Sequence, residues 1–163
     1  MRIGVVSDTH NNLKNIDKII SIFNKEKVGL VVHTGDIASA NALEKFSSLV
    51  CPLIGVYGNN DRLEKGLEEV AARNGFLFKN PPLKITKMNR KIAIFHEPEL
   101  IDDFLSKNKD QSVVLHGHTH RFRMEIIDDV LFYNPGESAG MQAGKNALGI
   151  INLKDLSNER IFF

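Results

Sequence analysis

The chain has 163 residues, of which 42% are hydrophobic and 25% are charged, a composition that is ordinary for a globular protein. The formal net charge is only +1, so the sequence offers no strong field that would recruit nucleic acid or an anionic membrane. Cys51 is the single cysteine, which excludes an intrachain disulfide and a thiolate metal cluster and suits a reducing compartment.

No segment is long and apolar enough to span a bilayer, and the apolar run near Met1 is too short for a secretory signal. We therefore expect a cytoplasmic protein without a membrane partner. No repeat or low-complexity segment divides the chain, and Pro81-Pro82, the best candidate joint, has only mildly polar flanks. We interpret this joint as a loop, expect one domain over residues 1–163, and leave homo-oligomerisation open.

The first half of the chain alternates strand-like runs with helical patterns. Residues 3–6, 30–32 and 53–57 are apolar or β-branched, as buried strands are. Three helices are predicted by apolar residues at helical spacing: Leu13, Ile16, Ile20 and Phe23; Leu43, Phe46 and Leu49; and Leu63, Leu67, Val70 and Ala71. Asn11-Asn12 is the candidate cap of the first helix, and Asn74-Gly75 is the expected end of the third.

The second half contains closely spaced strands. They are predicted at residues 92–95, 113–115, 124–127, 130–133 and 148–153. Asp128-Asp129 indicates a tight turn, and one more helix is expected to begin at Pro98. Its inward-facing residues are predicted to be Leu100, Ile101, Phe104 and Leu105. Strand–helix alternation followed by mostly antiparallel strands predicts an α/β fold of two packed mixed sheets flanked by helices.

Polar residues that can bind a metal follow five of the predicted strands. In chain order they are Asp8 and His10; Asp36; Asn59, Asn60 and Asp61; His96; and His118 and His120. Ligands of open α/β sheets collect beyond the carboxyl ends of strands, so we expect these segments to meet at one edge. Residues two apart in extended chain point the same way, which pairs Asp8 with His10 and His118 with His120.

Three glycines stand directly before candidate ligands. They are Gly35, Gly58 and Gly117. At such positions the backbone is expected to turn sharply or to approach another group closely.

The ordered motifs DTH, GD, GNND, H and GHTH resemble the calcineurin-like metallophosphoesterase superfamily, and the short chain resembles its small bacterial and archaeal phosphodiesterase branch. That branch is related to a scaffold subunit of retromer. Asn134-Pro135-Gly136 resembles a later structural signature of the family, so the resemblance covers nearly the whole chain. The resemblance implies a four-layer αββα sandwich, which agrees with the layers expected from the residues.

The resemblance also implies two divalent metal ions. It assigns Asp8, His10, Asp36 and His120 to one metal, and it assigns Asp36, as a bridge, Asn59, His96 and His118 to the second. The implied reaction is hydrolysis of a small-molecule phosphodiester by a hydroxide that bridges the metals. Charge supports this reaction, because Asp8 and Asp36 leave two positive charges on the pair, which one hydroxide and one diester balance. Imidazole, carboxylate and amide ligands together favour Mn²⁺, with Fe, Ni, Co or Zn as alternatives, over Mg²⁺ or Ca²⁺.

Two positions depart from the family pattern. Many members carry His, a general acid, where Asn60 stands, and the amide of Asn60 donates a hydrogen bond without usefully releasing a proton. Glu97 follows His96 where Gly is usual, and it either charges the phosphate site or points away. Asp61 is interpreted either as a cap of the third helix or as a residue that holds the ligands in place.

The remaining histidines and alternative functions stay open. The motifs assign neither His33 nor His116 to a metal, so we interpret both as structural, with His33 a candidate to orient a ligand. Asp8 alone could cap the first helix. A non-catalytic metal-binding scaffold or interaction module is one alternative function, and a phosphomonoesterase or nuclease is another. The complete set of seven ligands favours an enzyme, and the lack of a basic groove weighs against long nucleic acid.

Overall fold

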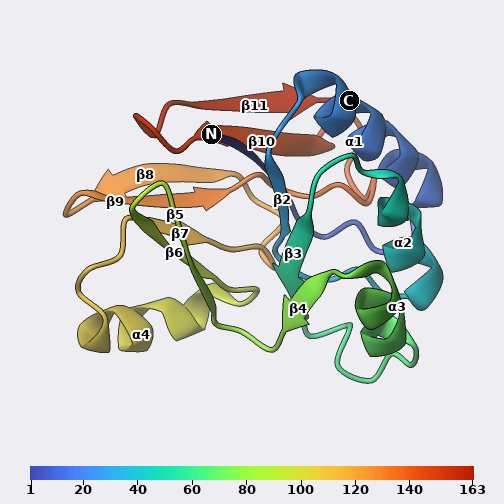
Figure 1. Cartoon of the computed structure of the whole chain (residues 1–163), viewed down its shortest axis with the longest axis horizontal. Coiled ribbons are helices and arrows are strands. Elements are labelled where there is room, and N and C mark those ends of the chain that lie inside the picture. Colours follow the sequence, from blue (N-terminus) through green and yellow to red (C-terminus); the bar gives the residue numbers. More distant parts are fainter.

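The computed structural model describes residues 1–163 and contains two β-sheets that pack face to face (Figure 1). The strands of the first sheet are β1 (Arg2–Val6), β2 (Leu30–His33), β3 (Leu53–Val56), β4 (Leu77–Lys79), β10 (Ala147–Asn152) and β11 (Asn158–Phe162). Their order is β11-β10-β1-β2-β3-β4. Strands β1 to β4 are parallel, whereas β10 pairs antiparallel with both β1 and β11. The carboxyl ends of β1, β2 and β3 therefore lie at one edge.

The second sheet is also mixed. Its strands are β5 (Leu83–Lys87), β6 (Arg90–Ile94), β7 (Val113–Leu115), β8 (Arg123–Ile127) and β9 (Val130–Asn134). Their order is β5-β6-β7-β9-β8, with parallel pairing of β6, β7 and β9 in the centre and antiparallel pairing at both margins. Asp128 and Asp129, both at positive φ, form the tight turn between β8 and β9, as predicted.

Four α-helices cover the outer faces of the sheets. They are α1 (Leu13–Glu26), α2 (Ala40–Lys45), α3 (Leu67–Asn74) and α4 (Ile101–Lys107), with 3₁₀ turns at Phe46–Ser48 and Pro98–Leu100. The Asn12 side chain caps α1 by accepting from the Asn15 N–H at 3.1 Å, and α3 ends at left-handed Gly75. Both ends agree with the sequence. None of these helices has the length and apolarity that crossing a membrane requires.

Three apolar clusters hold the four layers together. The first lies between α1, α2 and α3 and the outer face of the first sheet, and includes Phe23 and Phe46. The second fills the space between the sheets, where Val5 and Val32 meet Tyr133. The third packs α4 on the outer face of the second sheet. Side chains alternate between the two faces along each central strand, so each of these strands contributes residues to two of the three clusters. The four-layer αββα arrangement is the predicted one.

Three residues lie outside the helices that the sequence predicts for them. Leu49 follows the 3₁₀ turn Phe46–Ser48 and has extended backbone. Leu63 precedes α3 instead of packing within it, and its side chain is 95% exposed. The helix begins only after Gly66, whose left-handed backbone (φ 86°) separates Leu63 from it. Leu100 lies in the 3₁₀ turn before α4 and is also exposed. A 3₁₀ turn has three residues per turn, so this residue does not share the buried face of Ile101.

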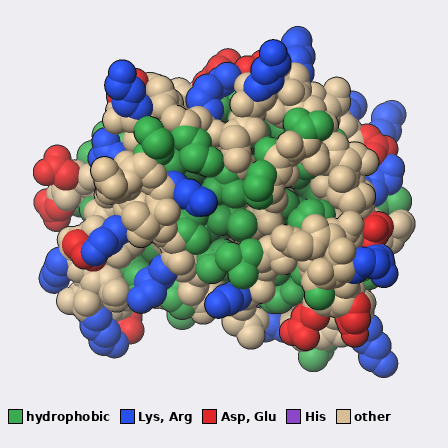
Figure 2. Space-filling model, in the orientation of Figure 1, with side chains coloured by type: hydrophobic (Ala, Val, Ile, Leu, Met, Phe, Trp, Pro, Cys, Tyr) green, Lys and Arg blue, Asp and Glu red, His purple; other side chains and the backbone are tan.

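The margins of the sheets are open on the face drawn in Figure 2, which shows apolar side chains at its centre. The same view in Figure 1 carries β3, β4 and β5 there. The exposed lysines Lys79, Lys84 and Lys87 lie on the edge strands β4 and β5. Charged residues on an edge strand discourage pairing with another chain. Residues 80–82, which contain Pro81-Pro82, link the two sheets directly, so this joint is a loop, as expected.

Candidate metal centre

The five polar segments meet where the two sheets come together. The loops after β1, β2 and β3 come from the first sheet, and those after β6 and β7 come from the second. Backbone hydrogen bonds join the loops: the Asp8 N–H donates to Gly35 O at 3.1 Å and the His10 N–H to Asp36 O at 2.9 Å. The His118 N–H donates to the Asp8 carboxylate at 3.2 Å, which ties the second sheet to the first.

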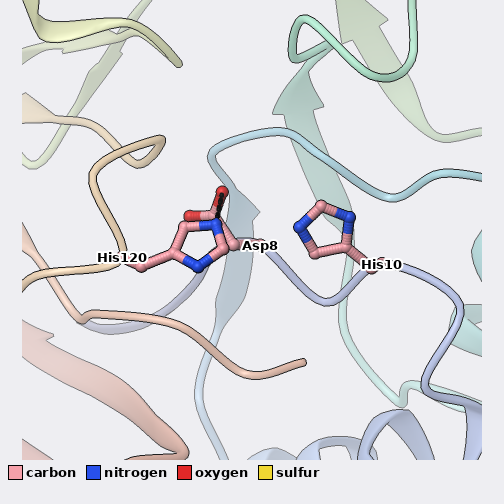
Figure 3. Close-up of side chains that lie close together, drawn as sticks. All are labelled: Asp8, His10 and His120. Atoms are coloured by element: carbon pink, nitrogen blue, oxygen red, sulfur yellow. Dashed lines mark ion pairs between the residues drawn. The ribbon is translucent and has the colours of Figure 1, made fainter. Parts of the chain in front are cut away.

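Asp8, His10 and His120 form the first group of candidate ligands, with one nitrogen or oxygen of each within 4.8 Å of the others. In Figure 3 the Asp8 carboxylate lies beside the His120 ring, and the His10 ring turns toward the same space. His120 Nε2 is 3.3 Å from Asp8 Oδ1. Asp8 Oδ1 and His10 Nε2 are buried and have no hydrogen-bond partner. Buried polar atoms are normally satisfied, and a cation between these two atoms would satisfy both.

Asp8, Asp36 and His96 form a second such group. His96 Nε2 lies 3.3 Å from Asp36 Oδ1 and 3.0 Å from Asn59 Oδ1. The other ring nitrogen, Nδ1, is 2.8 Å from the Thr34 carbonyl oxygen, and this contact turns Nε2 toward the group. Asn59 Oδ1 is also 3.0 Å from His118 Nδ1. The second group therefore brings together the carboxylate, amide and imidazole groups that the family resemblance predicts as ligands of a second metal.

Asp36 and Asp8 lie between the two groups. Asp36 Oδ2 is 3.9 Å from His10 Nε2 in the first group, while Oδ1 contacts His96 in the second, and Asp8 belongs to both groups. Burial opposes ionisation of Asp36, but the His96 ring and the Asn60 donors outweigh burial and lower the pKa of this carboxyl. Burial also opposes the charged form of His96, but the Asp36 carboxylate outweighs burial and raises the pKa of His96. The site is therefore an anionic pocket suited to cations.

The backbone at the ligands is left-handed. Five of the seven predicted ligands have positive φ: Asp8 (51°), His10 (44°), Asp36 (58°), His118 (68°) and His120 (56°). Non-glycine residues rarely adopt this region, and such conformations cluster at functional sites. The expectation that Asp8 pairs with His10, and His118 with His120, through extended chain is thus wrong. Tight turns, not strand alternation, aim these side chains.

Asp61 supports the loops and does not cap a helix. Its carboxylate accepts four backbone N–H groups, from Asp36 (2.9 Å), Ile37 (2.8 Å), Ala38 (2.7 Å) and Gly58 (2.8 Å). Helix α3 begins six residues later than Asp61, at Leu67, with Gly66 at its cap. Asp61 therefore joins the loops after β2 and β3. Burial raises the pKa of Asp61, and three of these N–H donors oppose the rise. Asp8 caps no helix either, because Asn12 caps α1.

Close approach explains all three glycines. A Cβ on Gly58 would lie 2.2 Å from Asp36 Oδ1, and a Cβ on Gly117 would lie 2.0 Å from Ser7 Oγ. Real Cβ atoms do not come so near another atom, so both positions require glycine. A Cβ on Gly35 would lie 2.6 Å from His96 Nδ1, and the φ of 103° at Gly35 also marks a sharp turn.

Glu97 forms an ion pair with Arg62. The guanidinium neutralises the carboxylate, whose effect on the phosphate site the sequence leaves open. His33 is fully buried, with Nε2 2.9 Å from Thr9 Oγ1 and Nδ1 accepting from the Gly35 N–H. Burial lowers the pKa of His33 to about 3, so the ring is neutral and links the loops after β1 and β2. Burial also lowers the pKa of His116, to about 4.

Ser7 and Thr34, which the sequence motifs do not single out, support the site, and so does Asn134 of the later structural signature. Ser7 donates to Asp8 Oδ2, and the Thr34 carbonyl orients His96. Asn134 Nδ2 donates to Gly117 O at 3.0 Å and to Thr119 Oγ1 at 3.2 Å, which fixes the loop that carries His118 and His120. Ser7 and Thr34 adjoin the motifs in the sequence, so position beside a motif was the available signal.

Two facing mixed sheets with carboxylate, imidazole and amide groups at the ends of their parallel strands define the metallophosphoesterase class. Residues 1–156 match the calcineurin-like phosphoesterase superfamily domain, and the chain belongs to this family. The predicted family and fold are thereby confirmed.

Relatives and solved structures agree with this assignment. The chain is 36% identical over 156 residues to Phosphodiesterase MJ0936 of Methanocaldococcus jannaschii, covering 93% of each protein. It is 28% identical over 137 residues to the probable metallophosphoesterase MJ0623 of that organism, covering 83% of this chain and 67% of the other. The structure of a novel archaeal phosphodiesterase superposes with a TM-score of 0.91 at 34% identity over 100% of both chains. Zinc-bound Vps29 from Entamoeba histolytica, at 17% identity, covers 99% of both chains with a TM-score of 0.70 and shows the shared fold alone.

Proposed function

We propose that the chain hydrolyses a small-molecule phosphodiester by attack of a hydroxide that bridges two divalent metal ions. The observation that carries this proposal is the Asp36 carboxylate, which contacts an imidazole of each ligand group, His96 at 3.3 Å and His10 at 3.9 Å. The relative with 36% identity, which aligns over 93% of each protein, is named a phosphodiesterase, and this supports the same reaction class.

The proposed ligands keep the division that the family resemblance implies. Asp8, His10, Asp36 and His120 would hold one ion, and Asp36, Asn59, His96 and His118 would hold the other. The unpartnered atoms Asp8 Oδ1 and His10 Nε2 fit this division. Metal pairs of this kind lower the pKa of water and polarise phosphoryl oxygens. The mixed ligands favour Mn²⁺, with Fe, Ni, Co or Zn as alternatives.

The protein's own groups hold this arrangement ready. Asn60 donates from its backbone N–H to Asp36 Oδ1 at 3.0 Å and from its side chain to Oδ2 at 2.7 Å, which keeps Asp36 ionised. Asp61 holds the Asp36 loop by backbone hydrogen bonds. We therefore assign positioning roles to Asn60 and Asp61, and the leaving oxygen takes its proton from water.

A hydrolysis screen tests the proposal. Bis-(p-nitrophenyl) phosphate and p-nitrophenyl phosphate are offered to the protein with Mn²⁺, Fe²⁺, Ni²⁺, Co²⁺, Zn²⁺ and Mg²⁺ in turn. We expect the diester to be cleaved faster in Mn²⁺, because two metals and two carboxylates leave a charge that one hydroxide and one singly charged diester balance. A clear preference for the monoester would make the chain a phosphomonoesterase. Metal binding without hydrolysis of either ester would favour the scaffold alternative.

A further inference from the structure

A cavity of about 500 Å³ lies beside the loop that carries His118 and His120, a size within the range of small-molecule sites. Its lining residues are Pro98, His116, Thr119, Arg121, Phe122 and Arg123. Thr119 stands between the two proposed metal ligands, and Arg121 follows the second directly. The cavity and the candidate metal centre therefore share the loop that carries His118 and His120.

The two arginines of this cavity differ in how they are occupied. The Arg123 guanidinium pairs with Glu125 and lies 4.6 Å over the Phe132 ring, so it is fixed in place. The Arg121 side chain has neither an ion pair nor a hydrogen bond, and it is exposed. Thr119 bonds to the Arg121 backbone and not to its side chain, with Thr119 Oγ1 accepting from the Arg121 N–H at 3.3 Å. Arg121 is thus a free cation in the wall of this cavity. A free guanidinium is well suited to bind phosphate.

The rest of the wall offers apolar surface and a polar atom. Phe122 is 43% exposed, and its ring is held by the Arg160 guanidinium at 4.5 Å and by Tyr133 edge to face. His116 is buried, and its Nε2 has no hydrogen-bond partner. A held aromatic ring beside two arginines suits an organic group that carries negative charge.

A second cavity has the opposite charge. It measures about 490 Å³, and its lining residues include Asp61, Glu64 and Glu68. The arginine in its wall, Arg62, is already paired with Glu97. Carboxylates repel an anionic group, so a substrate with charge beyond the reacting diester finds its favourable side at Arg121.

We propose that Arg121 and the cavity beside it bind a second phosphate group, so that the enzyme prefers phosphodiesters that carry an additional phosphate. This inference rests on the proposed phosphodiesterase function and adds a substrate class to it. Arg121 supplies the free cation, Arg123 supplies a fixed one, and Phe122 and Pro98 contact the organic part that joins the two phosphates.

Two chromogenic diesters that differ by one phosphate test the proposal. One is the p-nitrophenyl ester of thymidine 5′-phosphate, and the other is the same ester with a 3′-phosphate. We expect the wild-type protein in Mn²⁺ to cleave the 3′-phosphorylated ester with a kcat/KM on the order of tenfold higher, the effect of one hydrogen bond to a charged group. Arg121→Ala should bring the ratio of the two kcat/KM values close to one. Arg121→Lys should keep part of it.

Arg73→Ala is the matched control, because Arg73 on α3 pairs with Glu44 on α2 and neither residue lines the cavity. Its substrate ratio should equal that of the wild type. Equal kcat/KM values for the two esters in the wild type, or an unchanged ratio in Arg121→Ala, would overturn the proposal.

A binding measurement separates this inference from the catalytic one. Calorimetric titration of the Mn²⁺-loaded protein with thymidine 3′,5′-bisphosphate and with thymidine 5′-phosphate needs no turnover. We expect the bisphosphate to bind more tightly, with the difference lost in Arg121→Ala. If neither ester is hydrolysed, the phosphodiesterase proposal fails, and the titration still decides the cavity: equal affinities for the two nucleotides would rule out a second phosphate site.

Discussion

Asn60 has a different task from the general acid that many family members carry at its position. Both of its N–H groups, backbone and side chain, donate to the Asp36 carboxylate. Its amide therefore stabilises the ionised ligand and has no proton to give to the leaving oxygen. Asn60 therefore supports a metal ligand, whereas a His at this position would protonate the leaving oxygen. The rate of hydrolysis should consequently depend on the pKa of the leaving group.

Asn60→His should increase activity most for diesters with poor leaving groups. A nitrophenolate is stable as an anion and needs little protonation, whereas an alkoxide gains from a general acid, typically about 10²–10⁴-fold. The measurement is kcat/KM for diesters of graded leaving-group pKa, on both proteins with metal saturated. We expect a shallower dependence on leaving-group pKa in Asn60→His. Parallel dependences would mean that residue 60 is not at the position of the acid.

At the scale of the elements, the loop after β7 packs against the loop after β1 with no room to spare. The Gly117 N–H donates to His96 O. A Cβ added to Gly117 would lie 2.0 Å from Ser7 Oγ and 3.0 Å from Asp8 Oδ2. Close backbone approach is thus what lets ligands from two sheets share one site.

Gly117→Ala should destabilise the fold by about 1–3 kcal/mol, the usual cost of forcing an extra methyl group into a packed site. It should also weaken metal binding, since one of the crowded atoms is Asp8 Oδ2. Thermal unfolding and a metal titration measure the two effects. Gly29→Ala is the control, because its Cβ would come closest to the flexible Met1 side chain, at 3.3 Å, and would meet the Arg2 carbonyl oxygen only at an ordinary contact distance of 3.8 Å. Adding Ser7→Ala should recover part of the stability; a Gly117→Ala protein as stable as Gly29→Ala would contradict the packing argument.

Elements with a buried periodic face were predictable, and so was the exposed strand β8, whose residues 124–127 are mostly apolar. Three other marginal strands were not. Helix α1 and strands β1 and β2 show their pattern in the sequence because each packs into a core. Strands β4, β5 and β11 were missed, since they lie at sheet margins where polar residues interrupt the apolar pattern. The types and order of the candidate ligands were readable as motifs. Their left-handed backbone and the four N–H contacts of Asp61 were not, because both depend on how distant loops meet.

At the scale of the whole molecule, the candidate ligands join the two sheets. Asp8, Asp36 and Asn59 follow strands of the first sheet, whereas His96 and His118 follow strands of the second. Asp8 and Asp36 hold carboxylate oxygens within 4.8 Å of each other, and like charges this close repel. Cations bound between the sheets would remove the repulsion and cross-link the sandwich.

Metal binding should therefore raise the thermal stability of the protein. A ligand at 100 times its Kd stabilises by about 2.7 kcal/mol, and for a chain of this length each kcal/mol raises Tm by about 2–4 °C. Two ions at that level predict a rise of about 10–20 °C when Mn²⁺ is added to chelator-treated protein. Differential scanning calorimetry measures it, with Ca²⁺ as the control ion. A Tm that does not depend on Mn²⁺ would argue against ions at this position.

The most direct test of the two-metal centre is the metal content of Asp36→Ala. Protein loaded with Mn²⁺ and desalted is analysed by inductively coupled plasma mass spectrometry, beside the wild type and Asp17→Ala, an exposed carboxylate paired with Lys45. Because Asp36 contacts both ligand groups, we predict about two ions per chain in the wild type and in Asp17→Ala, and loss of both in Asp36→Ala. An Asp36→Ala protein that keeps two ions, or a wild type that binds only one, would contradict the shared-carboxylate centre.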